Sequence, residues 1–174
     1  MLMFFSLNIK CKIKRIELSR VNVSVVLLFE QLRTLEECFA LLYKSLSELE
    51  ENSKALQNIS KVLMREEERH ITLYENLMAE YKNKNTIMIN KDILVRVEYN
   101  IIMLKQGMNL NTLNSPKELI SLAINYENKS AFLLQEIMTF LKENTNEAKD
   151  LFAVFEILLA EEKKHADNLS IFLN

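Results

Sequence analysis

The sequence predicts an all-α protein, and three observations lead to that fold class. The chain of 174 residues contains one glycine and one proline, whereas sheet proteins and doubly wound folds need glycine at their tight turns. Leucine, phenylalanine and isoleucine recur at steps of three and four residues along most of its length. Few polar breaks interrupt these repeats, so we expect one domain of long helices joined by few loops.

Four stretches carry the helical repeat, at about residues 25–51, 54–81, 116–143 and 147–172. The second is expected to begin after Asn52, where Ser53 is suited to cap it. The third has the clearest start, because Ser115 and Glu118 form a capping box and Pro116 stands at the first helical position.

The lengths of the connections predict how these helices are arranged. The first two helices are joined by a short turn, as are the last two, so each pair is expected to form an antiparallel hairpin. A crossover at about 85–114 separates the pairs, and such a length can carry the chain from one end of a four-helix bundle to the other. The crossover contains a helical repeat of its own, made of Leu94, Val97, Ile101 and Leu104. We therefore expect residues 23–174 to form one bundle, with residues 1–22 as an appendage of uncertain structure.

Composition and charge exclude several function classes. The common glycine-rich phosphate loops cannot be written with one glycine, and a net charge of −2 gives no basic surface for nucleic acid. Cys11 and Cys38 are too far apart in the chain for a zinc or rubredoxin-type iron site, and they are expected to be reduced thiols. The apolar stretches at 1–7 and 21–29 are too short to cross a membrane. We therefore expect a cytoplasmic protein without nucleic-acid or membrane partners.

The two histidines each close a Glu-x-x-His pair in the middle of an apolar stripe. One pair is Glu67 and His70 in the second predicted helix, and the other is Glu162 and His165 in the fourth. A spacing of three residues puts both side chains on one helix face. A buried carboxylate beside an imidazole is costly unless its charge is compensated, and both groups are good ligands for first-row divalent metals. The pairs therefore indicate a metal site inside the bundle.

The first and third predicted helices each supply a further carboxylate. Glu127 lies on the apolar stripe of the third helix. In the first helix Glu36 lies about 85° from the centre of the apolar stripe and Glu37 about 175°, so Glu36 is the preferred candidate. One Glu from each of two helices, with Glu-x-x-His from the other two, is a di-iron or di-manganese ligand set. Tyr43 follows Glu36 by one heptad, and it is either a half-buried core residue or a residue beside the metals.

These motifs resemble those of the ferritin-like superfamily, and the di-iron domain of rubrerythrins most of all. The resemblance covers residues 30–172 and is carried by REEERH at 65–70, AEEKKH at 160–165, INYEN at 124–128, and Glu36 with Tyr43. It implies a ferritin-like four-helix bundle that holds two iron ions, or manganese, or one of each. It also implies an oxidoreductase that acts on peroxide or dioxygen, or that oxidises Fe(II).

The same resemblance assigns roles to the six candidate ligands. Glu67 and Glu162 would bridge the two metals. Glu36 and Glu127 would be terminal carboxylates, and His70 and His165 would be terminal imidazoles. The neighbouring glutamates Glu66, Glu68 and Glu161 are expected to face solvent.

The sequence departs from rubrerythrins in two respects. Rubrerythrins carry a second carboxylate one turn away in the third helix, whereas Ile124 and Ser130 flank Glu127 here. Rubrerythrins also carry a rubredoxin domain after the last helix, which we do not expect in this protein. The electron donor is therefore expected to be external, for example a rubredoxin-like protein, and the chain is expected to form a homodimer. The alternative function class is a non-catalytic helical bundle, with structural metal or none, used for oligomerisation or partner binding.

Overall fold

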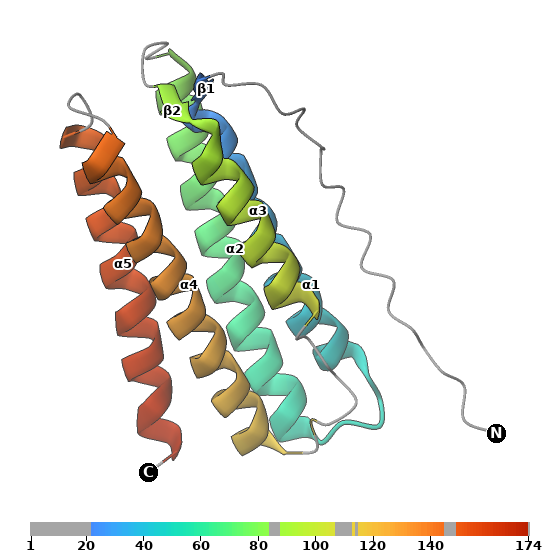
Figure 1. Ribbon diagram of the computed structural model, residues 1–174. Helices are drawn as coiled ribbons and strands as arrows, with labels where there is room; N and C mark the ends of the chain where they lie inside the picture. The colour runs from blue at the N-terminus through green and yellow to red at the C-terminus, as the bar shows by residue number, and fades with distance from the viewer. Residues whose placement is uncertain (1–21, 84–87, 107–112, 114, 145–148, 174) are drawn as a thin grey trace.

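The computed structural model describes residues 22–83, 88–106, 113, 115–144 and 149–173, and this part of the chain is helical apart from two short strands (Figure 1). The helices are α1 (Val25–Glu48), α2 (Lys54–Asn83), α3 (Lys91–Gln106), α4 (Pro116–Asn144) and α5 (Lys149–Ser170), followed by a 3-10 turn, η2 (Ile171–Leu173). The strands are β1 (Asn22–Ser24) and β2 (Met88–Asn90). The all-α class predicted from the sequence is confirmed.

Side-chain caps set the starts of α2 and α4. The backbone N–H of Leu56 donates to the hydroxyl of Ser53 (3.2 Å), so Ser53 caps α2 as predicted. At the start of α4 the Glu118 N–H donates to the Ser115 hydroxyl (3.2 Å), and the Ser115 N–H donates to the Glu118 carboxylate (3.0 Å). This reciprocal pair is the predicted capping box.

Helix α1 ends at Glu48, three residues before the predicted end at 51. Side chains beyond the helix bind its last carbonyls: the Asn52 amide donates to the Leu46 oxygen (2.7 Å), and the Gln57 amide donates to the Leu49 oxygen (2.9 Å). Because these carbonyls have partners outside the helix, the chain can turn early without leaving buried acceptors unpaired.

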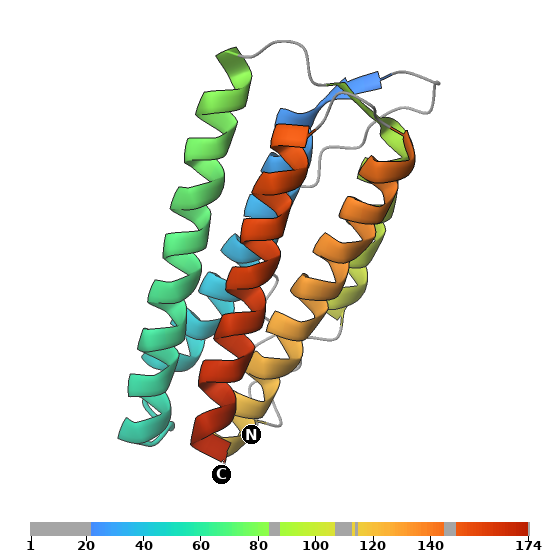
Figure 2. The same cartoon turned by 90° about the vertical axis from the view of Figure 1, so that its left-hand side faces the viewer.

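The helices lie side by side as two antiparallel pairs, α1 with α2 and α4 with α5 (Figures 1 and 2). Strand β2 and helix α3 follow α2 and run back along the molecule, so α4 begins at the end opposite to the one where α2 finishes (Figure 1). The four residues of the predicted repeat in the crossover, Leu94, Val97, Ile101 and Leu104, are all buried in α3. Helix α3 packs against α1 and α4. Of the predicted crossover, residues 85–87, 107–112 and 114 lie outside the described residues.

A two-stranded antiparallel ladder was not expected from the sequence. Asn22 pairs with Asn90, Val23 with Ile89 and Ser24 with Met88. The two strands are separated in the chain by the whole α1–α2 hairpin, so they need no tight turn and no glycine. Asn22, the last residue of the predicted appendage, belongs to β1, and residues 1–21 lie outside the described part.

Aromatic contacts join the two helix pairs. The Phe29 ring of α1 stacks on Phe155 of α5 (centroids 5.8 Å apart) and meets the edge of Tyr81 of α2 (5.4 Å). Further along α1, Phe39 stacks on Tyr126 of α4 (4.9 Å). Each contact buries a large apolar area. Because aromatic pairs have preferred geometries, each contact also favours one position of its two helices along their axes. Among the described helices, none combines the length and apolarity needed to span a bilayer.

Replacing Phe29 with alanine should destabilise the fold strongly. Its side chain is fully buried (0% exposed) between both helix pairs, and losing a buried phenylalanine costs about 3–5 kcal/mol. The matched control is Phe132→Ala in α4, where the side chain is 61% exposed and the expected change is within about 0.5 kcal/mol. Urea unfolding followed by circular dichroism measures both, and equal losses in the two variants would contradict the interpretation.

Candidate metal centre

Six predicted ligands from four helices meet in the interior. Helix α1 contributes Glu36, α2 contributes Glu67 and His70, α4 contributes Glu127, and α5 contributes Glu162 and His165. Five of these residues are buried, and the sixth, His165, has a side chain that is 13% exposed. On α2, α4 and α5 they occupy positions of the apolar stripe, and on α1 Glu36 lies at its edge, so burying the stripes turns these side chains inward.

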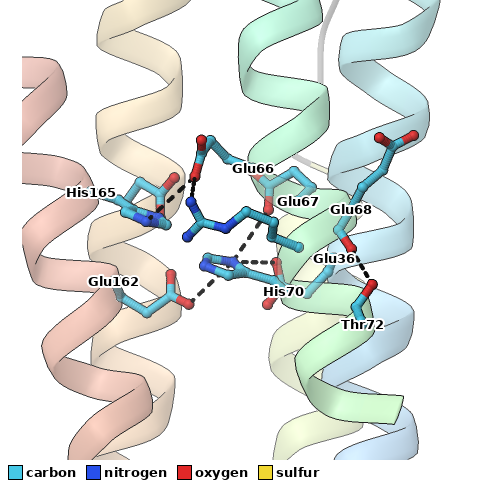
Figure 3. Close-up of polar contacts among 10 residues, drawn as sticks. Glu36, Glu66, Glu67, Glu68, His70, Thr72, Glu162 and His165 are labelled. Atoms are coloured by element: carbon cyan, nitrogen blue, oxygen red, sulfur yellow. Dashed lines mark hydrogen bonds and ion pairs between the residues drawn. The ribbon is translucent and has the colours of Figure 1, made fainter. Parts of the chain in front are cut away.

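His70 lies at the centre of this group (Figure 3). Its Nδ1 atom is 3.8 Å from Glu36 Oε2, 3.7 Å from Glu67 Oε2 and 3.7 Å from Glu162 Oε1. These separations exceed hydrogen-bond length, and neither ring nitrogen of His70 has a hydrogen-bond partner among the described residues. Burying an imidazole without hydrogen bonds costs free energy of folding, even when carboxylate acceptors lie nearby.

The spacing of these groups fits a shared cation. One potential ligand atom each from Glu36, Glu67 and His70 lies within 4.8 Å of the others. Metal–ligand bonds of about 2.0–2.2 Å place ligand atoms on one ion up to about 4.4 Å apart, so only small side-chain movements are needed. Carboxylate and imidazole are also the donor types that iron and manganese accept. This buried group could hold a metal ion.

The second half of the group is built from α4 and α5. His165 Nδ1 lies 3.9 Å from Glu127 Oε2 and, like the nitrogens of His70, is buried without a hydrogen-bond partner. The His165 and His70 rings stack with centroids 4.8 Å apart and planes 9° from parallel. Glu162 reaches across from α5 to His70. The structure therefore brings all six predicted side chains together.

The choice between Glu36 and Glu37 agrees with the geometry of α1. Glu36 is buried and faces His70, whereas the Glu37 side chain is 36% exposed and accepts a hydrogen bond from Arg33 (2.9 Å). Successive residues on a helix are rotated by about 100°, so only one of two adjacent glutamates can face the interior.

Of the three glutamates expected to face solvent, only Glu68 is exposed. Glu66 is partly buried, and its Oε2 lies 3.8 Å from His165 Nε2 and 2.8 Å from Arg69 Nη1. Glu161 is also partly buried and lines a pocket beside His70. Glu66 and Glu161 are therefore only partly open to solvent, at the edge of the centre.

Two tyrosines lie close enough to the centre for its carboxylates to change their pKa. Tyr43 is fully buried rather than half-buried, and burial together with Glu67 and Glu127 raises its pKa well above the ordinary value. Tyr74 is also fully buried, and burial together with Glu36 and Glu162 raises its pKa. Tyr74 is not among the site residues predicted from the sequence. Its position four residues after His70, on the same helix face, is the signal that could have identified it.

Burial and mutual repulsion raise the pKa of the carboxyl groups. Burial is the main cause for Glu67, Glu127 and Glu162, and neighbouring carboxylates add to it; the pKa of Glu127 is raised to about 7. Burial by itself would lower the pKa of His70, but Glu36, Glu67 and Glu162 raise it to about 11. Burial lowers the pKa of His165. Without a metal, the interior group therefore takes up protons to offset its negative charge.

A pocket of about 520 Å³ on the α2–α5 face reaches His70. Polar residues line most of it, namely Arg65, Glu68, Arg69, Thr72, Asn76 and Glu161. The pocket gives small polar molecules or ions an approach to the otherwise buried imidazole.

No protein-family model matches this chain, and neither a curated protein nor a solved structure matches it. A functional assignment therefore depends on the chemistry and geometry of the side chains.

The metal-free protein should lose stability between about pH 6.5 and about pH 8.5. The pKa of Glu127 in the fold, about 7, exceeds its ordinary 4.5, so the stabilisation from its bound proton is lost as pH rises from about 4.5 through 7, and only the last part of this loss falls above pH 6.5. His70 acts in the same sense, because the fold keeps its proton up to about pH 11 while the unfolded imidazole loses it above 6.5. His165 acts oppositely, but mostly below 6.5.

The expected loss is about 1 kcal/mol or more, a fall of at least about 2–4 °C in Tm. Thermal unfolding of the chelator-treated protein at the two pH values measures it. Adding saturating divalent metal should weaken or reverse the trend, since metal binding displaces protons and strengthens as pH rises. A metal-free Tm that stays level or rises over this interval would contradict the prediction.

Proposed function

We propose that this chain is a rubrerythrin-like protein of the ferritin-like superfamily that binds two metal ions, preferably iron, and acts as an oxidoreductase. The observation that carries the proposal is the environment of His70. Its Nδ1 faces carboxylates from three helices at 3.7–3.8 Å and has no hydrogen-bond partner within the part of the chain that the structure describes. Such a group is costly to bury unless a cation binds within it.

The path of the chain supports a ferritin-like four-helix bundle. Helices α1 and α2 form one antiparallel pair, and α4 and α5 form the other. The β2–α3 segment returns along the molecule, so α2 and α4 run in the same direction (Figure 1). One end-to-end crossover between two hairpins is the connectivity of ferritin-like bundles.

The positions of the side chains also support the ligand roles that the resemblance implies. Glu67 and Glu162 lie on opposite helix pairs and both approach His70 Nδ1 to 3.7 Å, which suits bridging groups. Glu36 and His70 would complete one metal site. Glu127 and His165, which are 3.9 Å apart, would complete the other.

A bound metal pair would supply redox chemistry, namely reduction of peroxide or dioxygen or the oxidation of Fe(II), with an external electron donor. The chain's own residues provide the setting. Four carboxylates balance the charge of two divalent cations, and the buried stripes above and below them exclude water. Tyr43 and Tyr74 keep their hydroxyl protons because burial and the nearby carboxylates raise the pKa of both.

The purified protein should bind about two iron ions per chain after anaerobic loading with Fe(II). Glu67→Ala and Glu162→Ala should each lose metal, because each would remove a ligand shared by both sites. Glu37→Ala is the matched control, since the Glu37 side chain faces outward and contacts Arg33. Metal analysis after gel filtration gives the stoichiometry, and circular dichroism confirms that each variant is folded; Glu67→Gln and Glu162→Gln serve where an alanine variant does not fold.

Less than about half a metal ion per chain in the wild type would overturn the proposal, because a pre-formed site binds its metal nearly stoichiometrically. Loading with Mn(II) in parallel shows which metal is preferred. Consumption of H2O2 and of O2 by the reduced protein then separates peroxide reduction from oxygen-dependent Fe(II) oxidation. Full metal occupancy without either activity would favour the alternative of a non-catalytic bundle with structural metal.

A further inference from the structure

Helices α3 and α4 lie side by side along one outer side of the molecule and run in opposite directions (Figures 1 and 2). Large apolar side chains are exposed on both helices. On α3 these are Val95, Tyr99 and Met103, which follow one another at steps of four residues, and on α4 the residue is Phe132. Single exposed apolar residues are common, but four on two neighbouring helices form a patch of the kind that marks a binding surface. We call it the α3–α4 face.

A groove of about 390 Å³ lies between the two helices on this face. Apolar side chains of both helices line most of it, namely Ile93, Val97, Phe132, Leu133, Ile137 and Phe140. The charged residues among those that line it are one of each sign, Arg96 of α3 and Glu136 of α4. A surface that is apolar and balanced in charge suits another protein surface better than it suits a nucleic acid.

One hydrogen bond shows which positions of the two antiparallel helices are level. The Asn100 amide donates to the Glu136 carboxylate (3.1 Å) near the middle of the face. Because both helices rise by about 1.5 Å per residue, Met103 is level with Phe132 on one side of this bond, and Val95 lies about as far away on the other. The middle of the face is therefore polar and both of its ends are apolar, so the pattern is unchanged when the face is turned end for end.

We propose that the α3–α4 face binds a second copy of this chain, in a homodimer whose two-fold axis passes through the middle of the face. The two-fold rotation places the apolar ends of one copy on the apolar ends of the other. It also brings Arg96 of each copy to within about one helical turn of Glu136 of the partner subunit. A face that carries both charges can pair with itself, whereas a face of one sign would repel its own copy. The sequence led us to expect a homodimer but did not indicate its interface.

The size of the face agrees with a weak dimer. Helix α3 has 16 residues, so it is about 24 Å long, and a helix with its side chains is about 10 Å wide. The two helices therefore present about 480 Å² per copy, or about 1,000 Å² for both copies, which reaches the lower limit for a specific interface. We expect a dissociation constant of about 1–100 µM. Urea unfolding below these concentrations reports on the monomer, so the effects expected there for Phe29→Ala and Phe132→Ala are unchanged.

The residues of the α3–α4 face are separate from those of the candidate metal centre. The pocket that reaches His70 is lined by α2 and α5, whereas the groove is lined by α3 and α4. A dimer formed through this face leaves that pocket open in both copies. The inference therefore does not depend on the proposed function, and the dimer should form with or without bound metal.

The first test is sedimentation velocity of the full chain from about 1 to about 100 µM, the range in which the dimer should form. Tyr99→Asp should raise the dissociation constant at least about 10-fold, because it removes an aromatic side chain from the middle of the interface and leaves a charge there without a partner. Ile157→Asp in α5 is the matched control, since Ile157 is 61% exposed, as Tyr99 is, but lies outside the face. Circular dichroism shows that each variant is folded.

The second test exchanges the two charges of the groove. Arg96→Glu and Glu136→Arg should each weaken the dimer about 10-fold or more, because like charges then meet across the two-fold axis. The double variant Arg96→Glu/Glu136→Arg should regain most of the affinity, since unlike charges meet again.

A wild type that stays monomeric up to about 100 µM overturns the inference, and the face would then be covered by another part of the chain or by a different protein. A dimer that Tyr99→Asp leaves as strong as the wild type also overturns it, because the two copies would then meet through another face. If the wild type binds no metal but dimerises in this way, the proposed function fails and this inference stands.

Discussion

The structure depends on how it compensates the negative charge that it buries. Four carboxylates from four helices share the interior with two imidazoles. Of the two imidazoles, only that of His70 has a raised pKa. Burying a carboxylate without a partner costs several kcal/mol. The raised pKa values of Glu67, Glu127 and Glu162 are a direct consequence of that cost. A pair of divalent cations would remove it, since four negative charges match two doubly positive ions.

The two helix pairs must be aligned along their axes for these side chains to meet. On α1, Glu36 lies between two aromatic contacts that cross between the pairs: Phe29 on Phe155 of α5 and Phe39 on Tyr126 of α4. Stacked rings resist sliding along the helix axis, because sliding moves the rings apart and loses their contact area. Packing on either side of Glu36 therefore positions carboxylates that would otherwise repel one another. Metal and cofactor sites in the cores of helical bundles are built in the same way: packed apolar residues fix the positions of the helices, and polar side chains bind the metal or cofactor.

Much of the centre was predictable because its residues interrupt apolar stripes. Glu67, His70, Glu127 and Glu162 stand where leucine would be expected. Helical rotation by itself places Glu36 nearer to the apolar stripe than Glu37. Tyr74 was missed because a tyrosine on a stripe is indistinguishable from an ordinary core residue. The contact between Glu66 and His165 was not predicted, because position on one helix does not reveal which side chain of another helix lies nearby. The β1–β2 ladder was missed for a related reason, since its strands come from distant parts of the chain.

By itself, the sequence determined the all-α class, the caps at Ser53 and Ser115 with Glu118, and the set of side chains that face inward. These properties are local: they follow from helical periodicity and from hydrogen bonds between residues a few positions apart. Only the tertiary structure decided that His70 meets carboxylates of three helices, that the two imidazoles stack, and that Glu66 reaches the far edge of His165. Those contacts depend on the relative height and rotation of separate helices, which are set by long-range packing and not by the spacing within any one segment.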